Sequence, residues 1–339
     1  MLNRPLTAAM LTAIALPASA DLVVLQYHHI SDQTPASTST TEALFRAQLE
    51  RIDDLGLEVV PLDSGTRAAL SGKLDDRQQV AITFDDAYAS VWATAAPLLE
   101  EYGYPYTVFV NTEAVGSHGY MTWQQLEQAS DDPNVLVANH SHDHSHLPRR
   151  PGESQEQWRQ RTTATLDRAQ RILTGKLGGS TPLFAYPYGE YDEGVEQLID
   201  EREWYGYGQQ SGAIGASSDP SRLPRFPMAT AYGQLDGLDD KLQSRALPVD
   251  ASTLPDGILR DNPPTLSFAL PTDLKPSTLT CFASGQGRIA VESNGQTVSV
   301  QAPDAFNSRR FRYNCTYPAG QGRFYWLSQQ WVDLTRPED

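Results

Sequence analysis

Short, β-branched apolar runs alternate with amphipathic stretches between residues 22 and 228. The apolar runs predict buried strands at residues 22–26, 58–62, 80–84, 106–110, 135–138, 183–186, 204–207 and 222–228. The amphipathic stretches predict helices, with capping signals at Ser39-x-x-Glu42 and Thr122-x-x-Gln125 and a long polar helix over residues 153–173. This alternation predicts a mostly parallel sheet with crossover helices, arranged as a barrel or as an open sheet.

The pattern changes after about residue 244, where prolines at 248, 255, 263 and 264 exclude a helix. Short alternating runs then predict strands at residues 279–283, 289–292, 297–301, 311–316 and 324–327. The dipeptide Asn294-Gly295, between two of these runs, predicts a type I′ hairpin. We therefore expect an α/β domain over residues 21–243 and a small all-β sandwich over residues 244–339.

The first 20 residues are typical of a secretory signal peptide. Arg4 precedes a short apolar core, Leu6 to Leu16, and Ala18-Ser19-Ala20 forms an A-x-A cleavage site. The core is too short to span a bilayer, and no later run of that length is equally apolar. We expect a periplasmic or secreted protein, without a transmembrane segment, whose mature chain begins near Asp21.

The charge of the chain limits its partners, and its cysteine content agrees with an exported protein. The formal net charge of −16 argues against a nucleic-acid partner. The two cysteines, Cys281 and Cys315, fit an oxidising compartment, and we expect them to form a disulfide. Such a bond would stabilise the chain by roughly 3–4 kcal/mol on the chain-entropy model. Two buried free thiols are the alternative.

The strand predicted at residues 80–84 ends in two adjacent carboxylates, Asp85 and Asp86. Neighbouring carboxylates repel each other, so a site that keeps both needs a compensating group. A bound cation would serve, with one aspartate as its ligand and the other left as a base. The alternative is an ordinary turn that happens to carry two aspartates.

Four of the seven histidines lie between Asn139 and His146. On a helical turn, His140 and His144 would share one face, and so would His142 and His146. An i, i+4 histidine pair is a common transition-metal ligand, but the spacing does not choose between the pairs. Two imidazoles and one carboxylate form an open, catalytic type of site, most naturally for zinc. A surface histidine-rich loop is the alternative.

Four polar segments lie at the ends of predicted strands. They are Tyr27-His28, Asp85-Asp86, Asn139-His140 and Tyr186-Pro187-Tyr188. In parallel sheets and barrels, functional groups gather at the carboxyl ends of the strands. We therefore expect these segments to share one site.

Three motifs resemble those of the polysaccharide deacetylases of the NodB-homology type, which include carbohydrate esterase family 4 and its poly-GlcNAc deacetylase relatives. They are Thr83-Phe84-Asp85-Asp86, His140-Ser141-His142-Asp143-His144 and Phe184-Ala185-Tyr186-Pro187-Tyr188-Gly189. The resemblance covers residues 22–230 and does not reach the C-terminal region. It implies a distorted (β/α) barrel of about seven strands, followed here by the all-β sandwich.

The resemblance also implies roles for individual residues. Asp85 would be the catalytic base, Asp86, His140 and His144 would bind Zn²⁺ or another divalent transition metal, and the Tyr188 backbone N–H would stabilise the oxyanion. The implied reaction is hydrolysis of the acetamide of an N-acetylated sugar, with Asp85 activating the attacking water.

Two features depart from the family pattern. Many members carry an arginine in the third motif, where this chain has Ala185; Arg225 is a candidate replacement, with a surface arginine as the alternative. Many members also use a late histidine as the general acid, but no histidine follows His146. His28 is our candidate, with its neighbour His29 open and a packed or capping His28 as the alternative.

Aromatic residues that could stack on sugar rings are Tyr120, Trp123, Tyr186 and Trp204, although each is also compatible with a core or rim position. The leading hypothesis is an exported, metal-dependent N-deacetylase of a GlcNAc-containing polysaccharide. Deacetylation of peptidoglycan or chitooligosaccharides, O-acetyl hydrolysis, and a catalytically degenerate glycan-binding protein remain alternatives. A C-terminal domain that only docks polymer predicts that its deletion spares activity on short oligomers.

Overall fold

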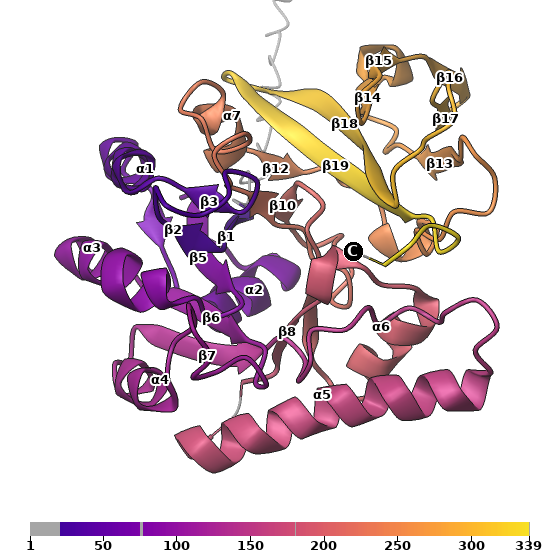
Figure 1. Cartoon of the computed structure of the whole chain (residues 1–339). Helices are drawn as coiled ribbons and strands as arrows, with labels where there is room; N and C mark the ends of the chain where they lie inside the picture. Colours follow the sequence, from indigo (N-terminus) through magenta and orange to yellow (C-terminus); the bar gives the residue numbers. More distant parts are fainter. Residues whose placement is uncertain (1–20, 75–76, 180, 339) are drawn as a thin grey trace, which may run out of the picture.

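In the computed structural model, which describes residues 21–74, 77–179 and 181–338, the α/β region is built on one curled, half-barrel sheet (Figure 1). The signal-peptide prediction lies outside the described residues. The sheet has the strand order β10-β1-β5-β6-β7-β8-β9, with β11 beside β1 and β4 beside β5. Its strands are β1 (Leu22–Tyr27), β4 (Glu58–Val59), β5 (Gln79–Asp85), β6 (Tyr106–Val110), β7 (Val135–Asn139), β8 (Leu183–Ala185), β9 (Tyr205–Tyr207), β10 (Ala213–Ile214) and β11 (Phe226–Pro227).

The strands from β1 to β9 run parallel, so their carboxyl ends lie at one edge of the sheet. Asp85 is paired with Phe109 across β5 and β6, and Asn139 with Phe184 across β7 and β8. The predicted polar segments therefore follow neighbouring strands at a common edge. The prediction of a mostly parallel α/β sheet is confirmed, and its form is a curled half-barrel.

Helices connect the strands and cover the outer face of the sheet (Figure 1). They are α1 (Glu42–Asp54), α2 (Leu62–Leu70), a π-helical turn (Val91–Ala95), α3 (Ala96–Tyr102), α4 (Trp123–Ser130), α5 (Gln155–Leu177), α6 (Glu193–Asp200) and the short α7 (Leu238–Leu242). Thr122 and Gln125 form the predicted capping box of α4. The cap of α1 was mispredicted, because Thr41 caps this helix and Ser39 lies in the two-residue strand β3 (Ser39–Thr40), which pairs with β2 (His29–Ile30).

Two strand predictions were too long. The run 58–62 contributes only β4, and its last residue, Leu62, begins α2 because a proline precedes it and fixes a helix start. The run 222–228 is extended over Phe226–Pro227 alone, since its prolines cannot donate ladder hydrogen bonds.

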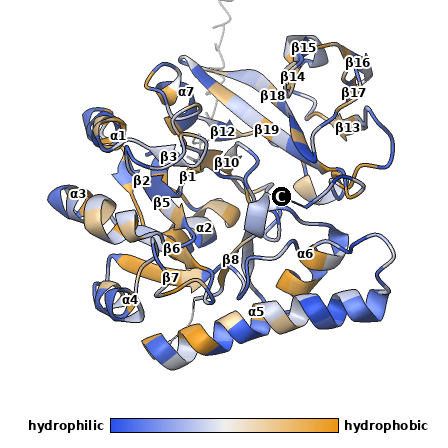
Figure 2. Cartoon of the chain, viewed as in Figure 1, coloured by the Kyte–Doolittle hydropathy of each residue, from blue (hydrophilic) through white to orange (hydrophobic). Residues whose placement is uncertain are grey.

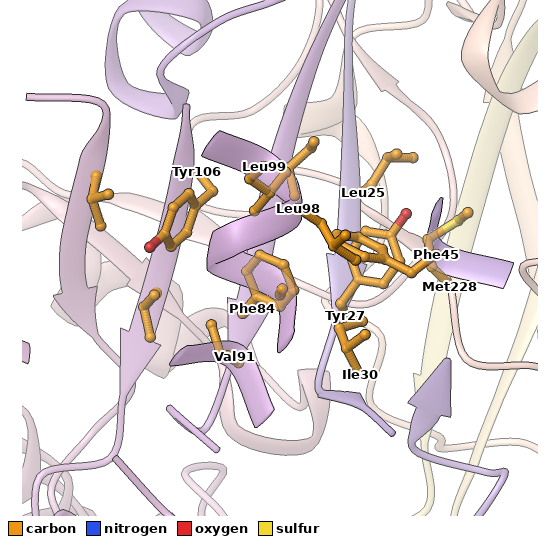
Figure 3. Close-up of a cluster of buried hydrophobic side chains, with 14 of the residues drawn as sticks. Leu25, Tyr27, Ile30, Phe45, Phe84, Val91, Leu98, Leu99, Tyr106 and Met228 are labelled. Atoms are coloured by element: carbon orange, nitrogen blue, oxygen red, sulfur yellow. The ribbon is translucent and has the colours of Figure 1, made fainter. Parts of the chain in front are cut away.

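The principal core lies between β1, β5, β6 and the helices α1 and α3. Tyr27, Phe45 and Phe84 meet there with ring centroids 5.0 to 6.0 Å apart (Figure 3). The Tyr27 hydroxyl donates to Gln48 Oε1, so the one polar atom of this aromatic group is satisfied. Figure 2 shows β6 and β7 as mostly hydrophobic, whereas α5 carries many hydrophilic positions. These strands hold the site edge rigidly because both their faces are covered.

The C-terminal region is all-β and forms two sheets around its own core. One sheet has the order β12-β19-β18-β14-β15 and the other β13-β17-β16. The strands are β12 (Arg245–Ala246), β13 (Thr265–Ala269), β14 (Thr280–Ala283), β15 (Gly287–Ile289), β16 (Val291–Asn294), β17 (Thr297–Gln301), β18 (Arg310–Gly320) and β19 (Arg323–Val332). We refer to residues 244–338 as the β-domain.

Several details of the β-domain differ from the sequence prediction. β13 was not predicted, and the single run 289–292 belongs to two strands that lie in different sheets. β16 and β17 form a hairpin at the predicted place, but its loop residues are Gly295 and Gln296, and only Gly295 has a positive φ, at 60°, so the predicted type I′ turn was wrong. Cys281 and Cys315 face each other on β14 and β18 and form the predicted disulfide.

Across the described part of the chain, none of the helices combines the length and apolar character needed to cross a bilayer.

Candidate active site

The Asp85-Asp86 pair lies where β5 turns sharply away from the sheet. Asp86 and Ala87 have φ values of 73° and 55°, in the left-handed region that residues other than glycine rarely adopt. Asp85 is fully buried and Asp86 is 6% exposed. Strained backbone at two consecutive residues is typical of a site whose side chains must point in set directions.

Asp85 is held by a guanidinium from a distant part of the chain. Arg225 donates from Nη1 to Asp85 Oδ1 at 2.7 Å and from Nη2 to Oδ2 at 2.8 Å. Arg225 is itself fully buried, so it is not the surface arginine that we considered as the alternative. Burial alone would raise the pKa of Asp85, but the charges of Arg225 and nearby groups outweigh it and hold that pKa below its usual range. Asp85 is therefore ionised and fixed in orientation.

Asp86 faces His140 and His144, which lie at the same edge of the sheet. Its Oδ1 lies 3.3 Å from His144 Nε2 and 3.6 Å from His140 Nε2, and the three potential ligand atoms lie within 4.8 Å of one another. The segment that carries the histidines is a loop, and the expected helical turn was wrong. Positive φ values at Ser141 (66°) and His144 (49°) fold this loop so that both rings meet Asp86.

The three side chains fit a divalent transition metal. His140 Nδ1 lies 2.7 Å from the Ala185 carbonyl oxygen and donates to it, which leaves the Nε2 lone pair directed at Asp86. Burial lowers the pKa of His140 to about 3 and that of His144 to about 4, so both rings are neutral. Burial, with the charge of Asp85, raises the pKa of Asp86 to about 6. A cation would favour the ionised carboxylate and use both neutral imidazoles.

The other two histidines of the segment have different partners. His142 Nδ1 lies 2.8 Å from Thr112 Oγ1, and His146 Nδ1 lies 2.8 Å from Glu190 Oε2. The choice that the spacing left open is thus decided by tertiary contacts, which bring His140 and His144 to Asp86.

Tyr188 lies in a tight turn after β8, the 3₁₀ segment Pro187–Gly189, with its own φ at 57°. Its ring is stacked on His146 at a centroid distance of 3.9 Å and meets the edge of His144 at 4.6 Å. The turn follows the same sheet edge as Asp85, as the sequence predicted. The third-motif residue Ala185 contributes its carbonyl to His140, so this position orients a ligand even without an arginine side chain.

Asp86, His144 and Tyr188 line a cleft of about 850 Å³. His28 lines it, and its positive charge, when present, would favour the ionised forms of Asp85 and Asp86. His29 instead stacks on Tyr88 at a centroid distance of 3.5 Å, outside the residues that line the cleft. The structure therefore places His28, rather than His29, beside the two carboxylates.

Most of the proposed sugar-stacking residues do not reach the cleft. Tyr186 is fully buried and donates to the Ser221 carbonyl, while Trp204 packs on Phe184 and Trp123 packs against the principal core. These three expectations are corrected, because the ring of Tyr186 is buried and those of Trp123 and Trp204 pack, partly buried, against apolar clusters away from the cleft. Tyr120 does line the cleft.

Several residues of the site were missed by the sequence analysis. Gln26 donates from Nε2 to Asp85 Oδ2 at 2.7 Å, and Asn111 donates from Nδ2 to Asp86 Oδ1 at 3.0 Å. Each is a polar residue at or just after the end of a buried apolar strand, which was the available signal. Arg310 and Arg312 of the β-domain also line the cleft, and no local pattern pointed to them.

Comparison with known proteins agrees with this geometry. Residues 72–204 match the family model described as polysaccharide deacetylase. The chain is similar to the poly-beta-1,6-N-acetyl-D-glucosamine N-deacetylase of Staphylococcus epidermidis, with 22% identity over 246 residues that cover 65% of this chain and 84% of the relative.

Solved structures show the same fold. IcaB from Ammonifex degensii superposes with a TM-score of 0.57 and 21% identity, covering 66% of this chain and 96% of that one. The Streptococcus pyogenes deacetylase PplD, in complex with acetate, superposes with a TM-score of 0.56 and 23% identity, covering 62% and 93%. The α/β region therefore matches the polysaccharide deacetylase family model over residues 72–204 and shares the fold of these solved deacetylases. The resemblance inferred from the three motifs is confirmed.

Proposed function

We propose that this protein is an exported, metal-dependent hydrolase that removes N-acetyl groups from a GlcNAc-containing polysaccharide. One observation carries the proposal: a buried carboxylate, Asp85, fixed by Arg225, lies directly before Asp86 of the Asp86-His140-His144 set, and Asp86 and His144 line one cleft. A degenerate glycan-binding protein would have no use for a base held in this way.

Asp86, His140 and His144 would hold the metal, and their donor set suits zinc best. When bound, a divalent cation at this position polarises the acetamide carbonyl and lowers the pKa of a neighbouring water. The fit rests on two neutral imidazoles and one carboxylate within reach of one another.

The protein's own groups divide the proton transfers. Asp85 accepts the proton of the attacking water, and the Arg225 fork keeps this carboxylate ionised and correctly oriented while lowering its basicity. His28, across the cleft, is the proposed donor of a proton to the leaving amine. The backbone N–H of Tyr188 is the proposed donor to the oxyanion.

The poly-GlcNAc deacetylase of Staphylococcus epidermidis supports GlcNAc polymers as the substrate class, because the similarity covers most of that relative. The disulfide supports an oxidising location outside the cytoplasm.

The test is acetate release by the purified protein, with chelator and metal add-back, across poly-GlcNAc, chitooligosaccharides, peptidoglycan and O-acetylated glycans. We expect release from N-acetylated polymers that stops on chelation and returns with zinc. Release from O-acetylated glycans alone would change the reaction to ester hydrolysis. Binding to glycans without release from any of them would contradict the enzymatic proposal.

A further inference from the structure

The β-domain contributes one wall of the active-site cleft. Along β18, Phe311 and Tyr313 point into the core of the β-domain, and both are buried. Successive side chains of a strand face opposite sides, so Arg310 and Arg312 point away from that core. Both line the cleft that Asp86 and His144 also line. The hairpin of β18 and β19 lies against the α/β domain in Figure 1.

Contacts between the domains fix this wall in place. Glu190, just after the Tyr188 turn, is fully buried and accepts from Arg309 Nε at 2.8 Å and from Arg310 Nη1 at 2.8 Å. Arg310 also lies over the Tyr188 ring, 5.3 Å from its centroid. Gln330 of β19 donates to the Gly189 carbonyl. The β-domain is therefore attached to the same turn that supplies the proposed oxyanion donor.

Arg312 is held differently from its two neighbours. Its Nη1 donates to the Gln209 carbonyl at 2.8 Å, and it forms no ion pair with any carboxylate of residues 21–74, 77–179 or 181–338. The side chain is half-buried, and burial lowers its pKa. A partly desolvated charge without a counter-ion is unfavourable, so a guanidinium kept in this state inside a cleft is typical of a ligand site.

We propose that Arg312, supported by Arg310, binds a carboxylate on the glycan, so that the preferred substrate is an acidic N-acetylated polysaccharide. This inference rests on the proposed deacetylase function and narrows its substrate. The planar guanidinium fork matches a carboxylate and gains most where water is partly excluded. A dianionic phosphate fits less well, because Glu113 and Asp143 line the same cleft.

The overall charge of the protein opposes an acidic substrate. A protein with a net charge of −16 repels an acidic polymer at long range, so such a substrate requires a local cation at the site. Arg312 is that cation, and it comes from the β-domain, outside the region that matches the family model. The β-domain is then a specificity element that touches short oligomers too.

The test compares three acetylated oligosaccharides of equal length: neutral GlcNAc oligomers, oligomers alternating GlcNAc with a uronic acid, and oligomers alternating GlcNAc with a lactyl-ether sugar. The variants are Arg312→Gln, Arg312→Lys and, as a control on the exposed face of the same domain, Arg288→Gln. We expect Arg312→Gln to raise KM for one carboxylate-bearing oligomer by about 10- to 100-fold, as for a lost charge-assisted hydrogen bond. KM for the neutral oligomer should change by less than about twofold, and so should kcat for the neutral oligomer and for the acidic oligomer that the protein prefers.

The acidic oligomer whose KM rises in Arg312→Gln shows whether the bound carboxylate belongs to a uronic acid or to a lactyl-ether sugar.

Arg312→Lys should recover part of the affinity lost in Arg312→Gln, because lysine restores the positive charge without the guanidinium fork. An equal rise of KM on neutral and acidic oligomers, or an equal effect of Arg288→Gln, would overturn the inference.

Binding calorimetry with the same oligomers separates this inference from the proposed function. If the wild type releases no acetate from any glycan but binds an acidic oligomer at least about tenfold more tightly than Arg312→Gln does, the carboxylate site stands and the deacetylase proposal fails. If wild type and Arg312→Gln bind every oligomer equally, the carboxylate site is wrong whatever the activity.

Discussion

Two fully buried carboxylates, Asp85 and Glu190, meet arginine side chains in different parts of the molecule. Asp85 is paired with Arg225 inside the α/β domain, beside the metal-ligand set. Glu190 is paired with Arg309 and Arg310 across the boundary with the β-domain. Each carboxylate has a pKa below its usual range. The Arg225 charge outweighs the cost of burial at Asp85, and hydrogen bonds with His146, Arg309 and Arg310 outweigh it at Glu190.

The same type of pair therefore serves two purposes. A buried ion pair contributes little net stability, but removing one partner leaves a costly unpaired charge. Asp85 is buried next to Asp86, which lines the cleft, and we propose that it acts as the base. Glu190 instead contacts two arginines of the β-domain. We expect substitutions at the first pair to change turnover, and substitutions at the second to change stability.

The largest effect should come from the ligand set. His140→Ala removes a ligand that no neighbouring side chain replaces in this arrangement, so the purified protein should retain no metal and release no acetate. His142→Ala is the matched control, because His142 is bonded to Thr112 instead. Metal analysis after dialysis measures both. Retained metal in His140→Ala together with lost metal in His142→Ala would reverse the ligand assignment.

Asp85→Asn should reduce kcat by about 10³- to 10⁴-fold, the range for loss of a general base, while metal content stays unchanged. The amide keeps the shape of the side chain but cannot accept the proton. Acetate release and metal analysis on one sample test this directly. Turnover near that of the wild type would remove Asp85 as the base.

Glu190→Gln should destabilise the folded protein by about 3–5 kcal/mol, since it leaves two arginines with a neutral partner. Denaturant unfolding at neutral pH gives this value. Arg46→Gln is a control, because both side chains of its pair with Glu101 are exposed and exposed pairs contribute little. Equal stabilities of Glu190→Gln and the wild type would show that the domains do not depend on this pair.

The pH dependence of stability sharpens the same comparison. The pKa of Glu190 is lowered from 4.5 to about 2, so its ionised form stabilises the fold above about pH 4.5, and this contribution is lost as the pH falls towards 2. The difference in unfolding free energy between the wild type and Glu190→Gln should shrink over that interval. A constant difference would contradict the assigned pairing.

A smaller effect is expected from Arg225→Lys, which keeps the charge but loses the two-pronged contact with Asp85. We expect kcat to fall by about 10- to 100-fold because the base is less well oriented. The weaker contact also lets the pKa of Asp85 rise, so the acid limb of kcat/KM should move to higher pH. A fall in kcat with an unmoved acid limb would indicate that Arg225 acts only on orientation.

Much of the fold was accessible from the sequence because its signals are local. Apolar runs identified the strands that carry the site, and adjacency in the chain identified Asp85 and Asp86 as a pair at a strand end. The sequence did not predict where the aromatic residues lie. The residue types of Tyr186 and Trp204 are equally compatible with stacking on a sugar and with packing in the core. Only the packing of the chain decided that Tyr186 is buried and that Trp204 lies, partly buried, against the same apolar cluster.

The sequence by itself determined the resemblance to polysaccharide deacetylases, the sheet that carries the site and the residues of the three motifs. The tertiary structure decided which histidine pair meets Asp86, that Arg225, 140 residues away, holds Asp85, and that β18 brings Arg310 and Arg312 to the cleft. The physical reason is the distance along the chain over which each signal acts. Periodicity and adjacency act over a few residues, whereas the partners of a buried charge are set by how distant segments pack.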